Sequence, residues 1–395
     1  MIQSLKGYLL IQDINKIIDL NNKKIIEKMI SNGAIVYIVG GAIRDYYLNY
    51  SINDLDLEVY NISFDQLKEL FKEEKTYINE TFKTIKLNNI EIALPRFETK
   101  VGLNYTDYQL TFNNIEPKQA IMRRDFTINS LMYNLNENKL YDFCNGVNDL
   151  DNNLLKAVNY DKFKEDSIRA LRLLKYQSKL NLEIDDRTFK SASEISSDLW
   201  KQPEMMVASL FKNIINNKYF KIELLFDVLN DFFEVERLKN NISTSKHHPE
   251  KSLYNHIVGT IKCLFLLEID NKNDFEILFW TLFFHDYGKL DVNHTHNLVS
   301  IEYFNKYKDY VVTKRKHQDM IKKLIEDHMC IREYAQNNDE IKMKHLKNKY
   351  RNQFHLLTIV GMCDYGGRVL DFNEEKLKER MQEYHEVVIK KYEVL

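Results

Sequence analysis

Two aspartates separated by one leucine, Asp54 and Asp56, are the first side chains in this sequence whose type and spacing point to chemistry. Successive side chains of a β-strand point to opposite faces, so both carboxylates would project from the same face of a strand. Two negative charges held this close favour a bound cation, and oxygen ligands favour a hard divalent ion. The pair therefore predicts a Mg²⁺ site, whereas an isolated Asp-x-Asp is usually a solvated strand end.

A glycine pair comes shortly before the two aspartates, between an apolar run at residues 35–39 and a helix-like segment. Glycines let backbone amides approach a phosphate closely, and the N-terminus of the following helix favours an anion. Alone, such a pair is usually only a turn. Before two metal-binding carboxylates it predicts a triphosphate beside the metal, as in phosphoryl transfer. The candidate nucleotide-binding residues of this turn are Gly40, Gly41, Arg44 and Asp45.

The elements that must position these residues follow from the apolar spacing. We expect a helix within 1–30, strands at 35–39, 81–87 and 90–94, and a helix at 64–71. Asn88-Asn89 suits a tight hairpin turn between the last two strands. Glu91 lies on the second of these strands, either as a third metal-binding carboxylate or as a solvated charge. Residues 95–117 predict an irregular loop, which inside a domain is usually functional or mobile.

Arginine is scarce in this chain: only 13 of its 56 Lys and Arg residues are Arg. Arginine offers a rigid planar fork for phosphates and base edges that lysine cannot copy, so its positions are informative. Six of the thirteen are Arg44, Arg96, Arg123, Arg124, Arg169 and Arg172. Two of them open a second polar motif, whose candidate nucleotide-binding residues are Arg123, Arg124, Asp125 and Asn129.

A third motif, Glu-Asp-Ser-Ile-Arg, lies in a stretch with helical spacing at residues 163–180. On a helix Asp166 and Arg169 would share a face, with Arg172 one turn further. One interpretation is a surface ion pair worth roughly a few tenths of a kcal/mol. The other is base readout, because Asp accepts from an exocyclic amine and Arg donates to ring acceptors. Such a pair matches cytosine and adenine but not guanine and uracil, so it predicts selection of CTP and ATP.

These motifs stand in the order seen in bacterial CCA-adding enzymes, the tRNA nucleotidyltransferases related to bacterial poly(A) polymerases. The chain resembles that family from about residue 35 to 190, through Gly-Gly-Ala-Ile-Arg-Asp, Asp-Leu-Asp, Ala-Leu-Pro-Arg-Phe-Glu, Arg-Arg-Asp-Phe-Thr-Ile-Asn and Glu-Asp-Ser-Ile-Arg. The resemblance implies a catalytic head, neck helices that select the base, and helical body domains for tRNA. The residues it implies are Asp54 and Asp56 for metal binding, Gly41 and Arg44 for the triphosphate, and Asp166 and Arg169 as a protein template.

The sequence departs from the family at Asn49 and Ser130, where the family usually has Gly and Ala. Both changes concern local turns and not the chemistry. Residues 95–114 correspond to the flexible loop that addition of A requires, which favours complete CCA addition over a CC-only enzyme. A poly(A) polymerase of the same fold is the nearest alternative, since Glu-Asp-x-x-Arg is compatible with both families.

A separate set of histidines gathers later in the chain, where eight of the eleven lie between His247 and His328. Scattered histidines are usually core or surface residues, but imidazoles together with carboxylates suit a divalent metal ion. The His-Asp pair followed by Gly-Lys resembles the HD phosphohydrolase domain, which hydrolyses phosphoesters such as 2′,3′-cyclic phosphates. The metal ligands implied by that resemblance are His256, His285, Asp286 and Asp364, with His296 and His328 as candidates for a second metal.

The composition, with 44% hydrophobic residues and a net charge of −2 over 395 residues, predicts several well-packed domains. Near-neutral charge means that nucleic acid would be held by a local basic patch. Four dispersed cysteines and no apolar run of membrane-spanning length predict a reduced cytoplasmic protein. We expect an α+β nucleotidyltransferase head with a mixed sheet at 1–148, an all-α neck and body at 149–240, and an all-α HD domain at 241–395.

The expected function is addition or repair of the 3′-terminal CCA of tRNA, with CTP and ATP as substrates. Mg²⁺ is expected at the head and a divalent metal of unknown identity in the HD domain. A poly(A) polymerase would instead extend RNA with A and ignore CTP. A third alternative is an HD phosphohydrolase whose head only binds RNA. The activity of the HD domain and the oligomeric state are left open by the sequence.

Overall fold

The computed structural model describes residues 18–102, 107–243, 249–292 and 294–390. His247, His248, the centre of the predicted loop at 103–106 and the first part of the predicted N-terminal helix lie outside the described residues. The chain divides into two compact units, Met1–Arg169 with Leu180–Ile195, and Ala170–Lys179 with Ser196–Leu395. The division into three domains stays a prediction.

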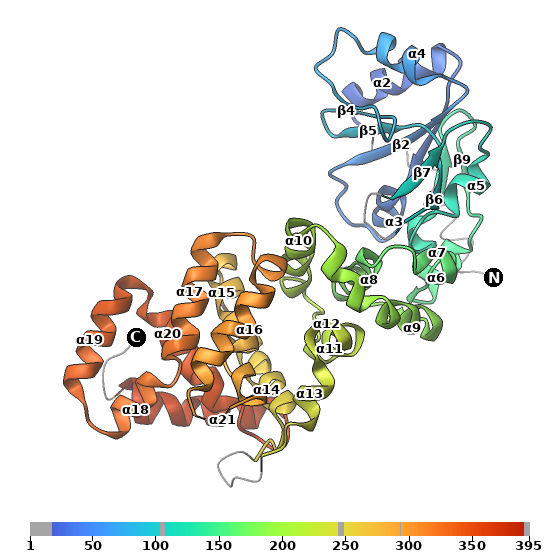
Figure 1. Ribbon diagram of the computed structural model, residues 1–395. Coiled ribbons are helices and arrows are strands. Elements are labelled where there is room, and N and C mark those ends of the chain that lie inside the picture. Colours follow the sequence, from blue (N-terminus) through green and yellow to red (C-terminus); the bar gives the residue numbers. More distant parts are fainter. Residues whose placement is uncertain (1–17, 103–106, 244–248, 293, 391–395) are drawn as a thin grey trace. The chain divides into compact units, whose positions relative to one another are not determined.

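A seven-stranded mixed sheet forms the centre of the first unit, in the order β3-β4-β5-β2-β1-β8-β9 (Figure 1). Its strands are β1 (Ile35–Val39), β2 (Leu55–Tyr60), β3 (Tyr77–Asn79), β4 (Thr84–Leu87), β5 (Ile90–Ala93), β8 (Met132–Asn134) and β9 (Lys139–Tyr141). Neighbouring strands are antiparallel except β2 and β5, which run parallel. The central strand β2 and its neighbour β1 are buried at nearly every position, as expected for strands covered on both faces.

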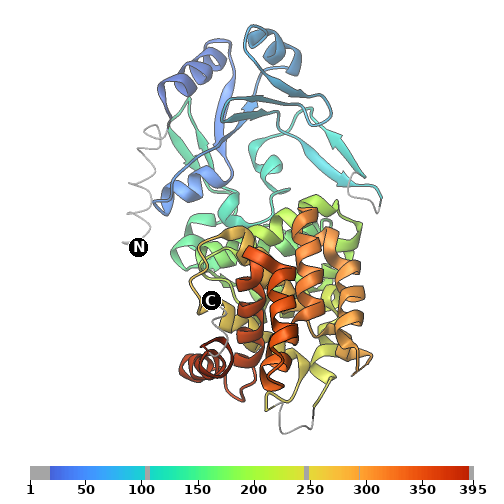
Figure 2. The same cartoon turned by 90° about the vertical axis from the view of Figure 1, so that its left-hand side faces the viewer.

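Short helices surround this sheet and connect its strands. They are α2 (Leu20–Ser31), α3 (Gly41–Tyr47), α4 (Phe64–Leu70), α5 (Pro117–Ile121), η2 (Thr127–Asn129), α6 (Gly146–Asp151), α7 (Tyr160–Phe163) and α9 (Asp186–Glu194). The carboxylate of Asp19 caps α2, and a capping box of Ser63 and Gln66 begins α4. Helix α2 packs on β1 and on α4, and both helices lie at the same end of this unit (Figures 1 and 2). A small parallel pair, β10 (Leu154–Leu155) and β11 (Glu183–Ile184), completes it.

The expectation of an irregular loop at 95–117 is wrong in part, because a hairpin of β6 (Phe97–Lys100) and β7 (Tyr108–Thr111) lies within it. Both strands alternate between exposed and half-buried residues, so no continuous apolar run marks them in the sequence. The strand expected from residue 81 begins only at Thr84. Asn49, which replaces a family glycine, adopts a φ of 58°, a left-handed conformation that asparagine tolerates.

The second unit is helical. Its elements are α8 (Ile168–Leu180, whose ends reach into the first unit), η3 (Ser196–Lys201), α10 (Glu204–Ile215), α11 (Ile222–Val228), α12 (Asn230–Phe233), α13 (Val235–Asn240), α14 (Leu253–Phe265), α15 (Lys272–Phe284), η4 (Tyr287–Leu290), α16 (His296–Val311), α17 (Arg315–Asp327), α18 (Cys330–Gln336), α19 (Glu340–Tyr350), η5 (Arg351–Gln353), α20 (Phe354–Gly366), α21 (Glu374–Tyr384) and η6 (His385–Ile389). In the described part of the chain, none of the helices is both long and apolar enough to span a membrane.

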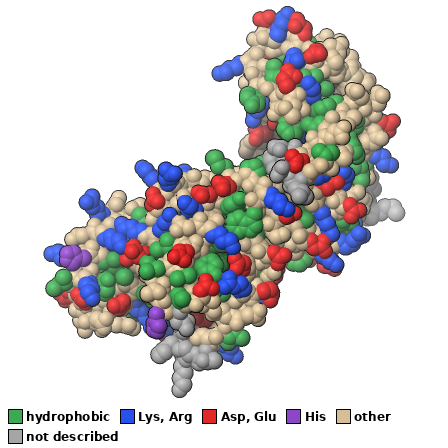
Figure 3. All heavy atoms as spheres, in the orientation of Figure 1, with side chains coloured by type: hydrophobic (Ala, Val, Ile, Leu, Met, Phe, Trp, Pro, Cys, Tyr) green, Lys and Arg blue, Asp and Glu red, His purple; other side chains and the backbone are tan. Residues whose placement is uncertain are grey.

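Helix α15 lies at the centre of this unit. Its sequence from residue 275 to 284 is apolar on nearly every side and completely buried, as expected for a core helix. Phe283 and Trp280 contact aromatic side chains of neighbouring helices, including Phe211 and Phe233. This packing fixes the C-terminal end of α15, where the His-Asp pair begins. On the outer face shown in Figure 3, Lys and Arg are interspersed with Asp and Glu, in keeping with the near-neutral charge.

Candidate active site and metal centre

The turn after β1 brings the glycine pair against the aspartate pair. Val39 and Asp56 are register partners in the antiparallel strands β1 and β2, so Gly40 follows directly beside the Asp56 carboxylate. Gly40 has φ +76°, and a Cβ atom there would lie 3.1 Å from Asp56 Oδ2 and 3.5 Å from Arg124 Nη1. Any larger residue would be strained at this φ and would crowd both groups. Three predicted site residues therefore meet at one turn.

The two predicted metal carboxylates are exposed at the start of β2. Asp56 belongs to the strand and Asp54 directly precedes it. Glu91 on β5 is the register partner of Asp56 and is also exposed, but these three carboxylates do not form a group with ligand atoms all within 4.8 Å. Two exposed carboxylates still fit Mg²⁺, which is commonly bound by one or two carboxylates together with water and substrate phosphates.

The guanidinium of Arg44 is buried in α3 and belongs to a polar network. Its Nε and Nη2 donate to Asp45 Oδ1 at 2.9 and 2.7 Å, and its Nη1 donates to Asn129 Oδ1. Asn129 Nδ2 donates in turn to Asp125 Oδ1 at 3.1 Å. These four residues, all predicted to bind the nucleotide, are thus tied together. The network joins the glycine turn to the Arg-Arg-Asp motif.

A buried glutamate that the sequence analysis did not single out, Glu58, contacts the two arginines of the Arg-Arg-Asp motif. Its Oε2 accepts from Arg123 Nη2 at 2.9 Å and lies 3.9 Å from Arg124 Nη2. Its Oε1 accepts from the Tyr60 hydroxyl at 2.6 Å. Burial, together with the charge of Arg123, lowers the pKa of Arg124 below its ordinary value. One signal could have found Glu58, since it is an acidic residue in the otherwise apolar end of β2.

The β6–β7 hairpin adds a second glutamate to these arginines. Glu98 Oε1 accepts from Arg96 Nε at 2.7 Å and lies 3.9 Å from Arg123 Nη1. Burial acts to raise the pKa of Glu98, but the charges of Arg123 and Arg96 outweigh it and hold that pKa below its ordinary value. The hairpin also reaches the third motif, because the Tyr108 hydroxyl donates to the Glu165 carbonyl at 3.2 Å.

The prediction that Asp166 and Arg169 lie on one helix from residue 163 is wrong, because α8 begins only at Ile168. Asp166 precedes the helix, and its Oδ1 accepts the N–H of Ile168 at 3.1 Å. A short polar side chain that bonds a nearby backbone N–H favours such a helix start over a helix interior. The two residues nevertheless stay close in the chain, on either side of this helix start.

Arg169 is anchored by two backbone carbonyls. Its Nη1 donates to the Lys162 carbonyl at 2.7 Å and its Nη2 to the Arg123 carbonyl at 2.8 Å. Each Nη carries a second hydrogen, so the anchored guanidinium keeps donors for a base. Arg172 lies one turn further along α8, and its Nη2 donates to the Tyr176 hydroxyl at 3.2 Å.

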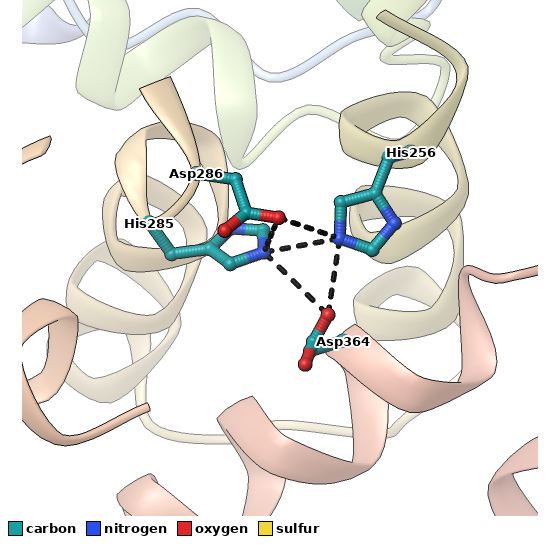
Figure 4. Close-up of side chains that lie close together, drawn as sticks. All are labelled: His256, His285, Asp286 and Asp364. Carbon is teal, nitrogen blue, oxygen red and sulfur yellow. Dashed lines mark hydrogen bonds and ion pairs between the residues drawn. The ribbon is translucent and has the colours of Figure 1, made fainter. Parts of the chain in front are cut away.

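The four ligands predicted for a metal in the second constellation converge in the helical unit (Figure 4). His256 lies on α14, Asp364 on α20, and His285 and Asp286 follow α15. His256 Nε2 lies 3.2 Å from His285 Nε2, 3.2 Å from Asp286 Oδ2 and 3.0 Å from Asp364 Oδ1. All four side chains are buried. Two imidazoles and two carboxylates converging in this way fit a divalent metal ion.

Asp286 also contacts a second group. Its Oδ1 lies 3.2 Å from His296 Nε2 and 3.6 Å from His328 Nε2, while its Oδ2 faces the first group. The Nε2 atoms of His296 and His328 are 3.4 Å apart. These three buried residues are a second set that could hold an ion. A carboxylate with one oxygen toward each set is suited to bridge two metal ions.

Backbone carbonyls set the tautomers of two of these histidines. His285 Nδ1 donates to the Leu282 carbonyl at 2.7 Å, and His328 Nδ1 donates to the Ile325 carbonyl at 2.8 Å. Because Nδ1 then carries the proton, Nε2 keeps its lone pair for a metal. Burial lowers the pKa of His285, which also favours the neutral ring.

Two cations flank the carboxylates of the centre. Lys289 Nζ donates to Asp286 Oδ2, and Arg368 Nη2 donates to both oxygens of Asp364 at 3.0 and 2.9 Å. Burial acts to raise the pKa of each carboxylate, but the cations and imidazoles hold both pKa values well below the ordinary one. Burial likewise acts to lower the pKa of His256, but the neighbouring carboxylates raise it to about 10. A pocket of about 720 Å³, lined in part by His256, Asp286 and Lys289, opens beside the centre.

A known protein family matches part of the first unit. Residues 36–156 match the model of the poly A polymerase head domain, from β1 through the glycine turn and both aspartates to the Arg-Arg-Asp motif. This part of the first unit is therefore similar to poly A polymerase head domains. The recognition made from the motifs is therefore confirmed for the head, whereas the HD domain stays a prediction.

Curated proteins to which this chain is similar include CCA-adding enzymes. The chain is 28% identical over 271 residues to the multifunctional CCA protein of Haemophilus ducreyi, covering 64% of each chain. It is 34% identical over 205 residues to the CCA-adding enzyme of Staphylococcus epidermidis, covering 49% of this chain and 50% of that protein. The matched region thus spans between half and two thirds of the length of these relatives.

Solved structures of CCA-adding enzymes share the fold beyond the stretch that matches the family model. A complex of a CCA-adding enzyme with ATP has a TM-score of 0.58 at 15% identity, covering 94% of this chain and 83% of that one. The Thermotoga maritima CCA-adding enzyme in complex with tRNA has a TM-score of 0.56 at 16% identity, covering 90% and 79%. At such low identity the similarity concerns the fold alone. It confirms the predicted order of a mixed-sheet head followed by helices.

Proposed function

We propose that this protein is a tRNA nucleotidyltransferase that adds or repairs the 3′-terminal CCA with CTP and ATP. The observation that carries the proposal is the meeting of Gly40, Asp56 and Arg124 at one turn of a poly A polymerase head. The CCA-adding enzymes among its relatives support tRNA as the acceptor. A cytoplasmic location, expected from the cysteines, suits an enzyme that acts on tRNA.

The proposed reaction is attack of the tRNA 3′-hydroxyl on the α-phosphate of the incoming nucleotide, with pyrophosphate as the leaving group. Asp54 and Asp56 would hold Mg²⁺, which would supply charge stabilisation for the transferred phosphoryl group. The backbone amides after β1 and the guanidinium of Arg124 bind the triphosphate. The buried network of Arg44 and Asn129 keeps the glycine turn in place beneath it.

Base selection is assigned to the residues around the start of α8. Asp166 accepts the exocyclic amine of cytosine or adenine, and Arg169 donates to the neighbouring ring acceptor. The two carbonyls that anchor Arg169 keep its guanidinium oriented before the base arrives. Guanine and uracil would leave buried polar groups unpaired, which is a strong basis for rejection.

The test is incubation with tRNA that ends at the discriminator base, with CTP, ATP, GTP and UTP supplied separately and together. Ordered addition of two C residues and then one A is the expected result. Long tails of A without any use of CTP would instead identify a poly(A) polymerase. Incorporation that persists in an Asp54→Ala variant would contradict the assignment of the metal carboxylates.

A second candidate function rests on the centre around Asp286, whose two oxygens each face a group of potential metal ligands. We propose that the helical unit is an HD-type phosphohydrolase for phosphoesters at RNA ends, such as 2′,3′-cyclic phosphates. Its six ligand residues would hold divalent ions, which would polarise a phosphoryl oxygen and activate water. Lys289 lines the adjoining pocket, where a cation favours a phosphate group.

The phosphohydrolase is tested by phosphate release from RNA that ends in a 2′,3′-cyclic phosphate, in the presence of Mg²⁺, Mn²⁺ or Ni²⁺. We expect release by the wild type and by Asp54→Ala, and loss of release in Asp364→Asn. Hydrolysis without any nucleotide incorporation by the wild type would favour a hydrolase whose head only binds RNA. Equal hydrolysis by wild type and Asp364→Asn would overturn the assignment of this centre.

A further inference from the structure

Glu58 is a buried acid that none of the recognised motifs contains. It is 1% exposed and lies on β2, two residues after the metal carboxylate Asp56. A buried carboxylate is costly unless it is paired and hydrogen-bonded. Glu58 uses one oxygen for the Tyr60 hydroxyl and the other for Arg123, so it has the partners that burial requires.

We propose that Glu58 is a positioning residue that gives the two arginines of the Arg-Arg-Asp motif different tasks. It fixes Arg123 as a support for Arg169 and leaves Arg124 to bind the triphosphate. The inference rests on the proposed nucleotidyltransferase function and adds to it a residue that controls base selection without touching the base.

The contacts of Arg123 make it a support and not a nucleotide ligand. Its side chain is 13% exposed, with Nη2 on Glu58 at 2.9 Å and Nη1 3.9 Å from Glu98. Its backbone carbonyl accepts from Arg169 Nη2 at 2.8 Å. Arg123 therefore connects a central strand of the sheet to the guanidinium that is assigned to base reading.

Arg124 differs from its neighbour in its contacts. Its Nη2 is 3.9 Å from Glu58 Oε2, too far for a hydrogen bond, whereas Arg123 Nη2 lies 2.9 Å from the same oxygen. The buried Nε atoms of both arginines have no hydrogen-bond partner among the described residues, so the contact to Glu58 is what distinguishes them. Arg124 Nη1 lies near Gly40, 3.5 Å from where a Cβ would stand. A guanidinium with unused donors at this turn is suited to an anionic phosphate.

The charge balance explains why the carboxylate of Glu58 matters. Two glutamates, Glu58 and Glu98, face three arginines, Arg96, Arg123 and Arg124. Replacing Glu58 by neutral Gln leaves Arg123 and Arg124 to repel each other in a buried place. The side chain of Arg123 is then no longer held against Glu58 of β2. Arg169 loses the Arg123 carbonyl, which is one of the two carbonyls that anchor its guanidinium.

The experiment measures the ratio of kcat/KM for CTP to that for UTP, with tRNA that lacks CCA, in wild type and Glu58→Gln. We expect the ratio to fall about tenfold, since a well-placed pair of base contacts discriminates by at least that factor. A general loss of stability lowers both rates equally and leaves this ratio unchanged. Tyr60→Phe keeps the contact between Glu58 and Arg123, and we expect it to keep most of the selectivity.

The matched control is Glu74→Gln, which breaks a 2.8 Å salt bridge to Lys28 in the same unit. Its ratio should equal that of the wild type. A Glu58→Gln ratio within about twofold of the wild type would overturn the inference. Equilibrium binding of CTP and UTP without RNA distinguishes failure of the proposed tRNA nucleotidyltransferase function from failure of the proposed role of Glu58. If the wild type prefers CTP but does not extend tRNA, the proposed function fails, and the binding ratio still tests Glu58.

Discussion

Val39 and Asp56 are register partners across the antiparallel strands β1 and β2. This pairing puts the residue after Val39, which is Gly40, beside the carboxylate of Asp56. The apolar residues of both strands are buried in the centre of the sheet, so the register is set by core packing. The distance between the glycine turn and the Asp56 carboxylate is therefore set by the register of the sheet.

Gly40→Ala tests this relationship, with Gly33→Ala as its control. Both glycines have positive φ, but a Cβ at Gly33 meets nothing within 4 Å, whereas one at Gly40 lies 3.1 Å from Asp56 Oδ2. Both variants should lose roughly 1–3 kcal/mol of stability from strain at positive φ, with the larger loss at Gly40, whose ψ is −141°. Only Gly40→Ala should lose nucleotide addition, by about 100-fold, because the reacting groups are displaced. Chemical unfolding and CMP incorporation measure the two effects, and equal activity losses would contradict the pairing argument.

The variants Asp56→Asn and Glu91→Gln test whether the carboxylate of β2, the carboxylate of β5 or both are needed for nucleotide addition. Asp56 faces the glycine turn, whereas Glu91 forms no three-carboxylate group with the aspartates. We expect Asp56→Asn to lower kcat for CMP addition about 100-fold or more, equivalent to roughly 3 kcal/mol of transition-state stabilisation. Glu91→Gln should change it less than about tenfold. A loss in Glu91→Gln as large as that in Asp56→Asn would make Glu91 a third metal ligand.

The centre around Asp286 predicts a pattern of metal binding that needs no activity assay. Asp286→Asn should weaken both sites because its two oxygens face both groups. Asp364→Asn should weaken only the first site, and His328→Ala only the second. Equilibrium dialysis against Mn²⁺, with metal content read by mass spectrometry, gives the stoichiometry. Binding of one ion by wild type and by His328→Ala alike would contradict a two-ion centre.

Glu98 predicts how the β6–β7 hairpin responds to acid. Its pKa in the folded protein is held below the ordinary value of 4.5 by Arg123 and Arg96, despite burial. Its contribution to stability is therefore complete above that value and is lost as the pH falls through the lowered pKa. Glu98→Gln should speed hydrogen exchange in the hairpin at pH 7, and its difference from the wild type should shrink in acid.

The control for this experiment is Glu27→Gln. Glu27 forms a 3.9 Å pair with Lys23 at the surface, where both side chains are more than half exposed. Such a pair contributes little, so hydrogen exchange in the hairpin should match the wild type at every pH. A Glu98→Gln difference that stays constant from neutral to acid pH would show that the carboxylate charge is not responsible.

Much of the first unit could be predicted from local patterns. The apolar run before the glycine pair, the alternating aspartates and the Asn-Asn turn act over a few residues, so β1, α3, β2 and β5 were expected near their observed places. The ligands His256, His285, Asp286 and Asp364 were also predicted, by resemblance, and they converge in the structure. The β6–β7 hairpin was missed because its short strands carry no apolar run.

The sequence by itself determined which chemical groups this protein has and the order in which they occur: a glycine turn, two alternating aspartates, an arginine pair and an Asp–Arg pair. Only the tertiary structure decided which of these groups contact one another. Glu58 and Arg123 are 65 positions apart, yet their contact separates the tasks of two adjacent arginines. The physical reason is that burial and charge pairing depend on which elements pack together, and residue types along the chain do not specify those partners.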